Sequence, residues 1–265
     1  MGNDRYDWLL PYRIEQLRQE IAELKASDQH YFASSEAICN GSFIDLGGVS
    51  QLAGLFDGWD VDILIYVRNQ VSLYESSFLQ RCKTGGYHGS AEDFLDYFNQ
   101  EKAGNFVQKI LPFVETFGQS RVHVVAYEDY RKNILQPIED ITGSSLPRDN
   151  LGKANVTGSV LSALVLQNIA RMTGTRLIGN QYHDFRRFVE ANIVDTIDSP
   201  TIVNASMATE IRAQYQQENE ELQRLFGVDV GPLETNREDR PYYSEEQIAQ
   251  ATAKLLLRLI DRKND

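Results

Sequence analysis

The sequence predicts a three-layer α/β fold, in which helices flank a parallel sheet, followed by a mostly helical carboxy-terminal half. Three short segments rich in β-branched and aromatic residues, at 30–35, 61–67 and 121–127, alternate with helical patterns. This alternation is typical of a parallel sheet whose strands are joined by helices. After the third segment the strand-like composition stops, and helical periodicity continues to the end of the chain.

The first helix is predicted over residues 11–26, because Pro11 suits a first helical turn and apolar residues then recur at steps of three and four. The strand at 30–35 follows. Between the second and third strands, a helix is predicted over 71–83, then a loop, KTGGYHGS. Ser90 followed by Asp93 indicates the start of another helix.

Three helices are predicted in the carboxy-terminal half, over 157–172, 206–226 and 244–260. The last of them opens with a Ser-Glu-Glu-Gln capping box. The stretch before it, 227–243, has the weakest periodicity, so it is a candidate linker. We therefore predict an α/β domain over residues 1–230 and a carboxy-terminal linker and helix over 231–265.

Composition and charge exclude several classes of protein. With 42% apolar and 10% aromatic residues among 265, the chain has enough side chains for a proper core, so disordered and fibrous classes are excluded. Lys and Arg number 26 and Asp and Glu 38, which gives a formal charge of −12. An acidic chain argues against a nucleic-acid partner, since phosphate neutralisation needs clustered cations.

The sequence predicts a cytoplasmic location and no transmembrane segment. Cys39 and Cys82 are too few for a disulfide framework. The first ten residues, MGNDRYDWLL, carry charges where a signal peptide needs an apolar core. The most apolar stretches are shorter than the roughly 20 residues that cross a bilayer. No cluster of histidine, cysteine and carboxylate residues has metal-ligand spacing, so no metal site is expected.

The richest chemical signal follows the second predicted strand. Arg68 comes directly after the strand, and Ser76 lies eight residues later in the next helix. In an open α/β sheet ligands bind beyond the carboxyl ends of the strands, where a guanidinium can hold a phosphate through two parallel hydrogen bonds. A helix serine can add a third donor. The alternative is a salt-bridged surface arginine and an ordinary helical serine.

At these residues the chain resembles sulfotransferases that use 3′-phosphoadenosine 5′-phosphosulfate (PAPS). Their 3′-phosphate signature is Arg-Asn-Pro-x-Asp-x-x-x-Ser, and here Gln70 replaces the proline and Ser72 the acid. HYFASSEAI resembles the preceding strand, LQRCKTGGYHGSAEDFLDYF the following loop and helix, and PFVETFGQSRVHVVAYEDYRKN the later helix, strand and turn. The likeness is strongest to bacterial sulfotransferase-family proteins and the carbohydrate N-sulfotransferase branch, and it covers residues 30–160.

The resemblance implies a nucleoside-kinase-like fold of the P-loop type and a binding site for PAPS or for its product, adenosine 3′,5′-bisphosphate. It assigns the 3′-phosphate to Arg68 and Ser76. The family also has an early glycine-rich loop with a lysine that holds the 5′-phosphosulfate. Residues 1–30 do not resemble it. Residues Lys83 to Gly86 resemble this loop in composition but follow a helix, and we interpret them as a helix cap.

Sulfuryl transfer also needs a base to deprotonate the acceptor. Glu36, after the segment HYFASS, stands near the position of a glutamate in N-sulfotransferase relatives; the alternative is a surface carboxylate at a helix amino terminus. His88, in the loop near the expected cofactor, is a second candidate base. His30 and His123 lie in or beside strands, which favours structural roles.

The functional prediction is a sulfotransferase-like protein that moves a sulfuryl group from PAPS to a hydroxyl or amine of a small molecule or carbohydrate. The alternative is a catalytically degenerate relative that binds a nucleotide or a protein partner. A glycosyltransferase or nucleotide kinase on a related sheet is a third possibility. The sequence does not specify the acceptor or the oligomeric state.

Overall fold

The computed structural model describes residues 11–25, 29–35, 38–39, 41–45, 47–148, 159–174, 180–231 and 240–264. The chain divides into two compact units, each assembled from separate stretches. Unit 1 comprises Met1–Arg68, Glu101–Leu146 and Gln217–Val230, and unit 2 comprises Asn69–Gln100, Pro147–Gln216 and Gly231–Asp265. The junction after Val230 falls at the predicted domain boundary, whereas the other junctions fall inside the predicted first domain, which stays a prediction.

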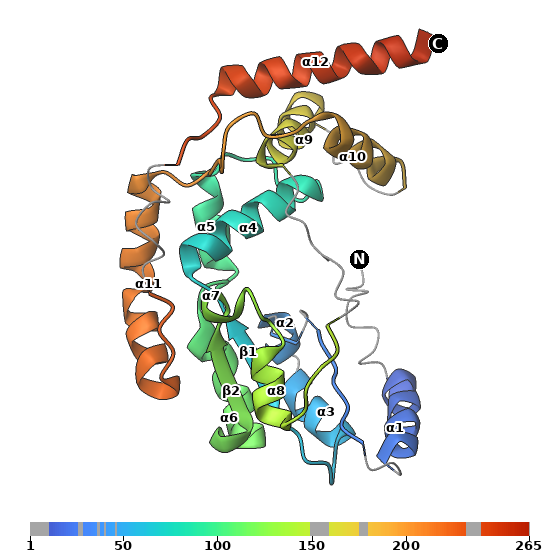
Figure 1. The fold of residues 1–265 in the computed structure, drawn as a ribbon, viewed down its shortest axis with the longest axis vertical. Coiled ribbons are helices and arrows are strands. Elements are labelled where there is room, and N and C mark those ends of the chain that lie inside the picture. Colours follow the sequence, from blue (N-terminus) through green and yellow to red (C-terminus); the bar gives the residue numbers. More distant parts are fainter. Residues whose placement is uncertain are drawn as a thin grey trace. The chain divides into compact units, whose positions relative to one another are not determined.

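Unit 1 contains a parallel pair of strands, β1 (Ile63–Val67) and β2 (Val122–Ala126), as Figure 1 shows. The register aligns Ile63 with Val122 and Val67 with Ala126. Its helical elements are α1 (Pro11–Lys25), α2 (Gly41–Asp45), α3 (Gly48–Leu55), α6 (Phe106–Phe117), α7 (Tyr127–Tyr130), α8 (Gln136–Thr142) and the end of α11 (Ala205–Phe226). Parallel pairing confirms the α/β class, and the chain is mostly helical.

The core of unit 1 lies between β1, β2 and the helices α2, α3 and α6. Ile65 and Val67 alternate along β1 and point to the same side, as the two-residue period of a strand requires. They pack in one cluster with Phe43, Val107, Ile110 and Phe113, each at most 3% exposed. Leu222, near the end of α11, completes this cluster.

Two of the three predicted strands are confirmed, and the third prediction is wrong. Residues 29–35 form no regular secondary structure and are exposed. The Tyr31 ring packs edge-on against Trp59, with ring centroids 5.9 Å apart, and its hydroxyl donates a hydrogen bond to the Leu24 carbonyl. Phe32 is 65% exposed. Aromatic residues gave this segment a strand-like composition, but the small residues that follow offer little to bury, so the described sheet has two strands.

Unit 2 is helical and is organised around α9 (Val160–Thr173), which is buried along nearly its whole length. It packs against α4 (Gln70–Lys83), α10 (Asn180–Asn192) and α12 (Glu245–Asn264). Aromatic side chains of α4 and α5 (Asp93–Gln100) form edge-on and tilted contacts beside it, among them Tyr74, Phe78, Phe94 and Phe98. The remaining element is the first part of α11.

Helix starts in unit 2 follow from side-chain capping. The predicted start at Ser90 is confirmed, because the Ser90 hydroxyl accepts from the Asp93 amide while the Asp93 carboxylate accepts from the Ser90 amide. Ser244 and Gln247 exchange the same pair of bonds at the start of α12. The helix α10 was not predicted, because its first turn is polar and lacks a recognisable cap.

The start of α9 depends on a carboxylate that is distant in sequence. Asp195 accepts from the amides of Val160 and Leu161 at 3.0 and 2.8 Å and from the Ser159 hydroxyl at 2.9 Å. The Tyr243 hydroxyl donates a further bond to this carboxylate. These bonds satisfy amides that an isolated helix leaves unpaired and place a negative charge at the positive end of the helix dipole.

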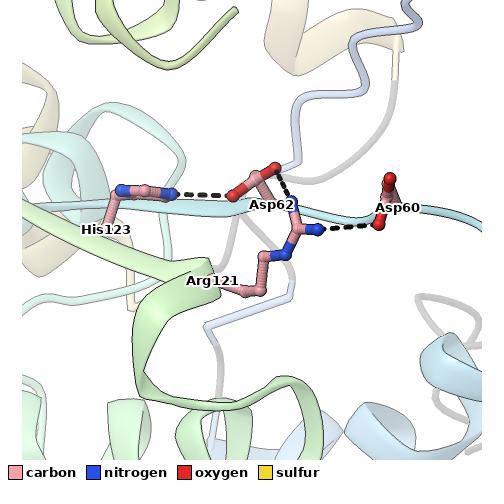
Figure 2. A network of polar contacts seen from close by, with 4 residues as sticks. All are labelled: Asp60, Asp62, Arg121 and His123. Atoms are coloured by element: carbon pink, nitrogen blue, oxygen red, sulfur yellow. Dashed lines mark hydrogen bonds and ion pairs between the residues drawn. The ribbon is translucent and has the colours of Figure 1, made fainter.

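A network of charged side chains lies at the amino end of the strand pair (Figure 2). Asp62 precedes β1 and accepts from Arg121 at 2.9 Å and from the Nε2 atom of His123 at 2.8 Å. Arg121 also contacts Asp60 at 2.7 Å. Burial alone would raise the pKa of Asp62, but the hydrogen bonds from His123 and Arg121 outweigh it and lower that pKa. The structural interpretation of His123 is therefore supported by its contact across the strands.

We predict that Asp62→Asn lowers the free energy of unfolding by about 1 kcal/mol at pH 7, because it removes the charged partner of Arg121 and His123. The folded-state pKa of Asp62 lies below its ordinary value, so this stabilisation is complete above about pH 4 and disappears as the pH falls through the folded-state pKa. Urea unfolding at several pH values measures the difference. Asp184→Asn, an exposed carboxylate on α10, controls for the change in net charge.

Candidate functional site

The carboxyl edge of the strand pair gathers three polar or aromatic side chains. Because β1 and β2 are parallel and Val67 aligns with Ala126, the residues that follow the two strands lie at the same edge. Arg68 follows β1, and Tyr127 and Glu128 follow β2 in the first turn of α7. Parallel pairing therefore brings together residues that are about 60 positions apart in the sequence.

The Arg68 guanidinium contacts a carboxylate and an aromatic ring that follow β2. Its Nε atom lies 3.7 Å from the Glu128 Oε1 atom, which is beyond hydrogen-bond distance. The guanidinium carbon lies 5.2 Å from the centre of the Tyr127 ring, a cation–π distance. The Arg68 side chain remains 34% exposed, and that of Glu128 25%. A positive group is thus oriented at the edge and stays accessible to an anion from solvent.

The helix α4 begins immediately after this edge, in unit 2. The Asn69 side-chain oxygen accepts from the amides of Val71 and Ser72 at 3.0 and 3.4 Å, so it caps the helix. Its side-chain amide donates to the Gly231 carbonyl at 2.5 Å. The predicted helix over 71–83 is confirmed, with its first residue at Gln70. Asn69, the second letter of the Arg-Asn signature, therefore has a structural task.

Ser76 lies in α4, partly buried, and its hydroxyl donates to the Leu73 carbonyl at 3.1 Å. Serine commonly forms this bond to the preceding turn of a helix. Arg68 belongs to unit 1 and Ser76 to unit 2, so the structure describes each in its own unit. Their joint binding of one phosphate stays a prediction.

The two candidate bases have different outcomes. Glu36 lies outside the described residues. His88 lies in the predicted loop of unit 2, where it is partly buried, and its Nδ1 atom is buried with no hydrogen-bond partner. Arg68 is in unit 1, so His88, the candidate base, and Arg68, the candidate phosphate ligand, belong to different units. The catalytic roles of Glu36 and His88 stay predictions.

The helix-cap interpretation of the run from Lys83 to Gly86 is confirmed. The amide of Gly85 donates to the Cys82 carbonyl at 3.2 Å and that of Gly86 to the Arg81 carbonyl at 2.8 Å, which is a Schellman motif. Gly85 adopts a φ of 65°, in the left-handed region. The run thus ends a helix, where the dipole is negative and disfavours a phosphate.

Lys83 itself is part of the interior of unit 2. It is 5% exposed, and Tyr182 donates its hydroxyl proton to the Lys83 carbonyl. Burial lowers the pKa of the Lys83 ammonium, and the nearby Glu190 carboxylate opposes this effect. Tyr182 has its own pKa raised to about 12 by burial. These surroundings anchor the end of α4 to α10.

Among the residues that the structure describes, no group of three or more histidine, cysteine, aspartate and glutamate residues is arranged to hold a metal ion. No helix there is both long and apolar enough to cross a membrane.

Comparisons with known proteins return no relatives: no protein-family model, no curated protein and no solved structure matches this chain.

Sequence reasoning identified Arg68 but did not assign roles to its neighbours Tyr127 and Glu128. A signal was present. Once 61–67 and 121–127 are taken as neighbouring parallel strands, the residues after each must share one edge. Tyr127 and Glu128, the aromatic and acidic residues that follow the second strand, were therefore candidates for contact with Arg68.

We predict that Gly85→Ala lowers the stability of the protein by about 1–2 kcal/mol, because a side chain at a φ of 65° is strained. Gly86→Ala is the matched control. Its Cβ atom would meet the nearest atom at 3.5 Å, an ordinary contact, so the change should stay within about 0.5 kcal/mol. Thermal unfolding measures both. Equal effects of the two substitutions would contradict the Schellman assignment.

Proposed function

We propose that this chain is a sulfotransferase-like protein that binds PAPS or adenosine 3′,5′-bisphosphate, with Arg68 as the main ligand of the 3′-phosphate. The observation that carries the proposal is the position of Arg68 after β1, oriented by Tyr127 and partly exposed. The resemblance of the surrounding segments to PAPS-dependent sulfotransferases supplies the identity of the nucleotide.

The electrostatics favour replacement of Glu128 by a phosphate as the partner of Arg68. A partly exposed ion pair at 3.7 Å contributes at most about 1 kcal/mol. A charge-assisted hydrogen bond from arginine to phosphate contributes about 1.5–3 kcal/mol, and two parallel bonds fit the fork of a guanidinium. Glu128 therefore serves as the counter-ion of Arg68 in the free protein, and a phosphate displaces it.

From the resemblance, Ser76 is proposed as a weaker phosphate ligand. Its hydroxyl donates to the Leu73 carbonyl at 3.1 Å, and a neutral donor of this kind contributes on the order of 1 kcal/mol to phosphate binding. The Asn69 side chain caps the amino terminus of α4, the helix that carries Ser76.

The proposed reaction transfers a sulfuryl group to a hydroxyl or amine, for which a carbohydrate is the proposed acceptor class. The acceptor atom forms a bond to sulfur, the bond from sulfur to the bridging phosphate oxygen breaks, and the acceptor proton passes to a base. Glu36 and His88 are the proposed bases. Adenosine 3′,5′-bisphosphate leaves, and the negative charge that builds on its 5′-phosphate needs a cation or a ring of amides.

A second candidate, nucleotide binding without transfer, is favoured by one observation. Lys83 is separated from the Gly85–Gly86 pair by one residue, as in a phosphosulfate loop, but it lies buried at the end of a helix. It therefore does not stand as the 5′-phosphate lysine of a phosphosulfate loop. We propose this binding role as the alternative to catalysis.

We predict that Arg68→Ala weakens the binding of adenosine 3′,5′-bisphosphate about ten- to a hundredfold, since it removes a charge-assisted contact. Glu128→Gln should strengthen binding about two- to tenfold, because it removes the competing carboxylate. Isothermal titration calorimetry measures both. Arg224→Ala is the control, since Arg224 is a 68%-exposed arginine of unit 1 in a similar pair with Glu221. Unchanged affinity in Arg68→Ala would remove the site assignment.

We also predict that the chain shows little or no sulfuryl transfer while it binds the product nucleotide. Relatives hold the leaving 5′-phosphate with a lysine and loop amides, and neither residues 1–30 nor the buried Lys83 matches that loop. Loss of even one such donor slows transfer by about 10²–10³. A radiolabelled-sulfate assay with sugars, amines and phenols measures transfer. If turnover is detectable, Glu36→Gln should slow it by about 10²–10⁴ and preserve nucleotide affinity. Robust turnover that Lys83→Ala abolishes would contradict this prediction and give Lys83 a catalytic role.

A further inference from the structure

The carboxy-terminal helix α12 has two apolar faces, and α9 covers one of them. Thr252 and Leu255 are 2% and 0% exposed on the covered face, and the Asn168 amide of α9 donates to the Thr252 hydroxyl at 3.1 Å. Figure 1 shows α12 beside α9 within unit 2. This packing holds α12 to its own unit, so the second face belongs to a folded helix.

The second face, here called the outer stripe, consists of Ala253, Leu256, Leu257 and Ile260. These residues recur at steps of three and four, so they share one side of the helix. The three large side chains are 37%, 61% and 57% exposed, in that order. Isolated exposed apolar residues are ordinary, but a continuous stripe on one helix indicates an interaction surface.

Charges beside the outer stripe select the partner. Lys254 and Asp261 are exposed, carry opposite charges and stand seven residues apart, which places them on the same flank of the helix. In an antiparallel pair of helices, the same flanks face each other. A two-fold axis near residues 257–258 then sets Lys254 opposite Asp261 of the second copy, twice. Leu257 lies beside this axis, so the Leu257 side chains of the two copies come close together.

The net charge of α12 also permits self-association. The whole chain carries −12, so most of its surface repels a second copy. In sequence, residues 245–264 contain four cations and three anions, which gives 4 − 3 = +1. Two copies that approach through α12 therefore avoid the repulsion expected elsewhere.

We propose that the outer stripe binds a second copy of this chain, through antiparallel pairing of the two α12 helices about a two-fold axis. Such a symmetric contact uses the same patch on both copies. About 14 residues of each helix overlap, or roughly 21 Å, which is smaller than the interfaces of permanent dimers. A reversible dimer with a dissociation constant on the order of tens of micromolar is expected.

Sedimentation velocity of the full chain, from about 1 to 500 μM, tests the proposal. The natural sequence should form dimers as the concentration rises, and Leu257→Gln with Ile260→Gln should weaken dimerisation at least about tenfold. Met172→Gln is the control, because Met172 is a 67%-exposed apolar residue of α9 outside the stripe. Circular dichroism verifies that every variant keeps its helix content.

A charge swap tests the antiparallel register. Lys254→Asp or Asp261→Lys alone should weaken the dimer about three- to tenfold, since each places like charges opposite one another. The double variant should recover the natural affinity to within about threefold. A monomer at all concentrations, a dimer that ignores the Leu257 and Ile260 substitutions, or a double variant without recovery would each overturn the proposal. Vesicle binding by a chain that stays monomeric would assign the stripe to lipid instead.

Discussion

The parallel pairing of β1 and β2 is the constraint on which unit 1 and the proposed site depend. The pairing places Ile65 and Val67 against α6 and the rest of the buried cluster, so one face of the sheet is buried in the core. It also determines which residues meet at each edge. Asp62, Arg121 and His123 meet at the amino edge, and Arg68, Tyr127 and Glu128 at the carboxyl edge.

Both edges pair an arginine with a carboxylate, but the distances between the two charged groups differ. Arg121 contacts two carboxylates at 2.7 and 2.9 Å, and His123 contacts one of them from the neighbouring strand. These contacts are at hydrogen-bond distance and join residues that flank both strands, so we interpret the amino edge as structural. Arg68 lies 3.7 Å from the Glu128 carboxylate, and we propose that a phosphate replaces this weak pair. The carboxyl edge is therefore the proposed place for a reversible ligand.

Sequence reasoning succeeded where local chemistry decides the structure. The runs ILIYV and VHVVA became strands, and the Ser90 and Ser244 capping boxes began helices. It failed at 30–35, because strand-like composition does not specify a neighbour to pair with. For the site, the position of Arg68 after a strand was predictable. Its contacts depend on which strands are neighbours, which is information about tertiary structure. The cap at Gly85 was predictable from the helix that precedes it.

We propose that Arg68 at the carboxyl edge holds the 3′-phosphate of a nucleotide, and a crystal structure of the chain with adenosine 3′,5′-bisphosphate is the sharpest test. We expect the 3′-phosphate within about 3 Å of the Arg68 guanidinium nitrogens, with Glu128 moved away from them. A nucleotide bound elsewhere, with the Arg68–Glu128 pair intact, would contradict it.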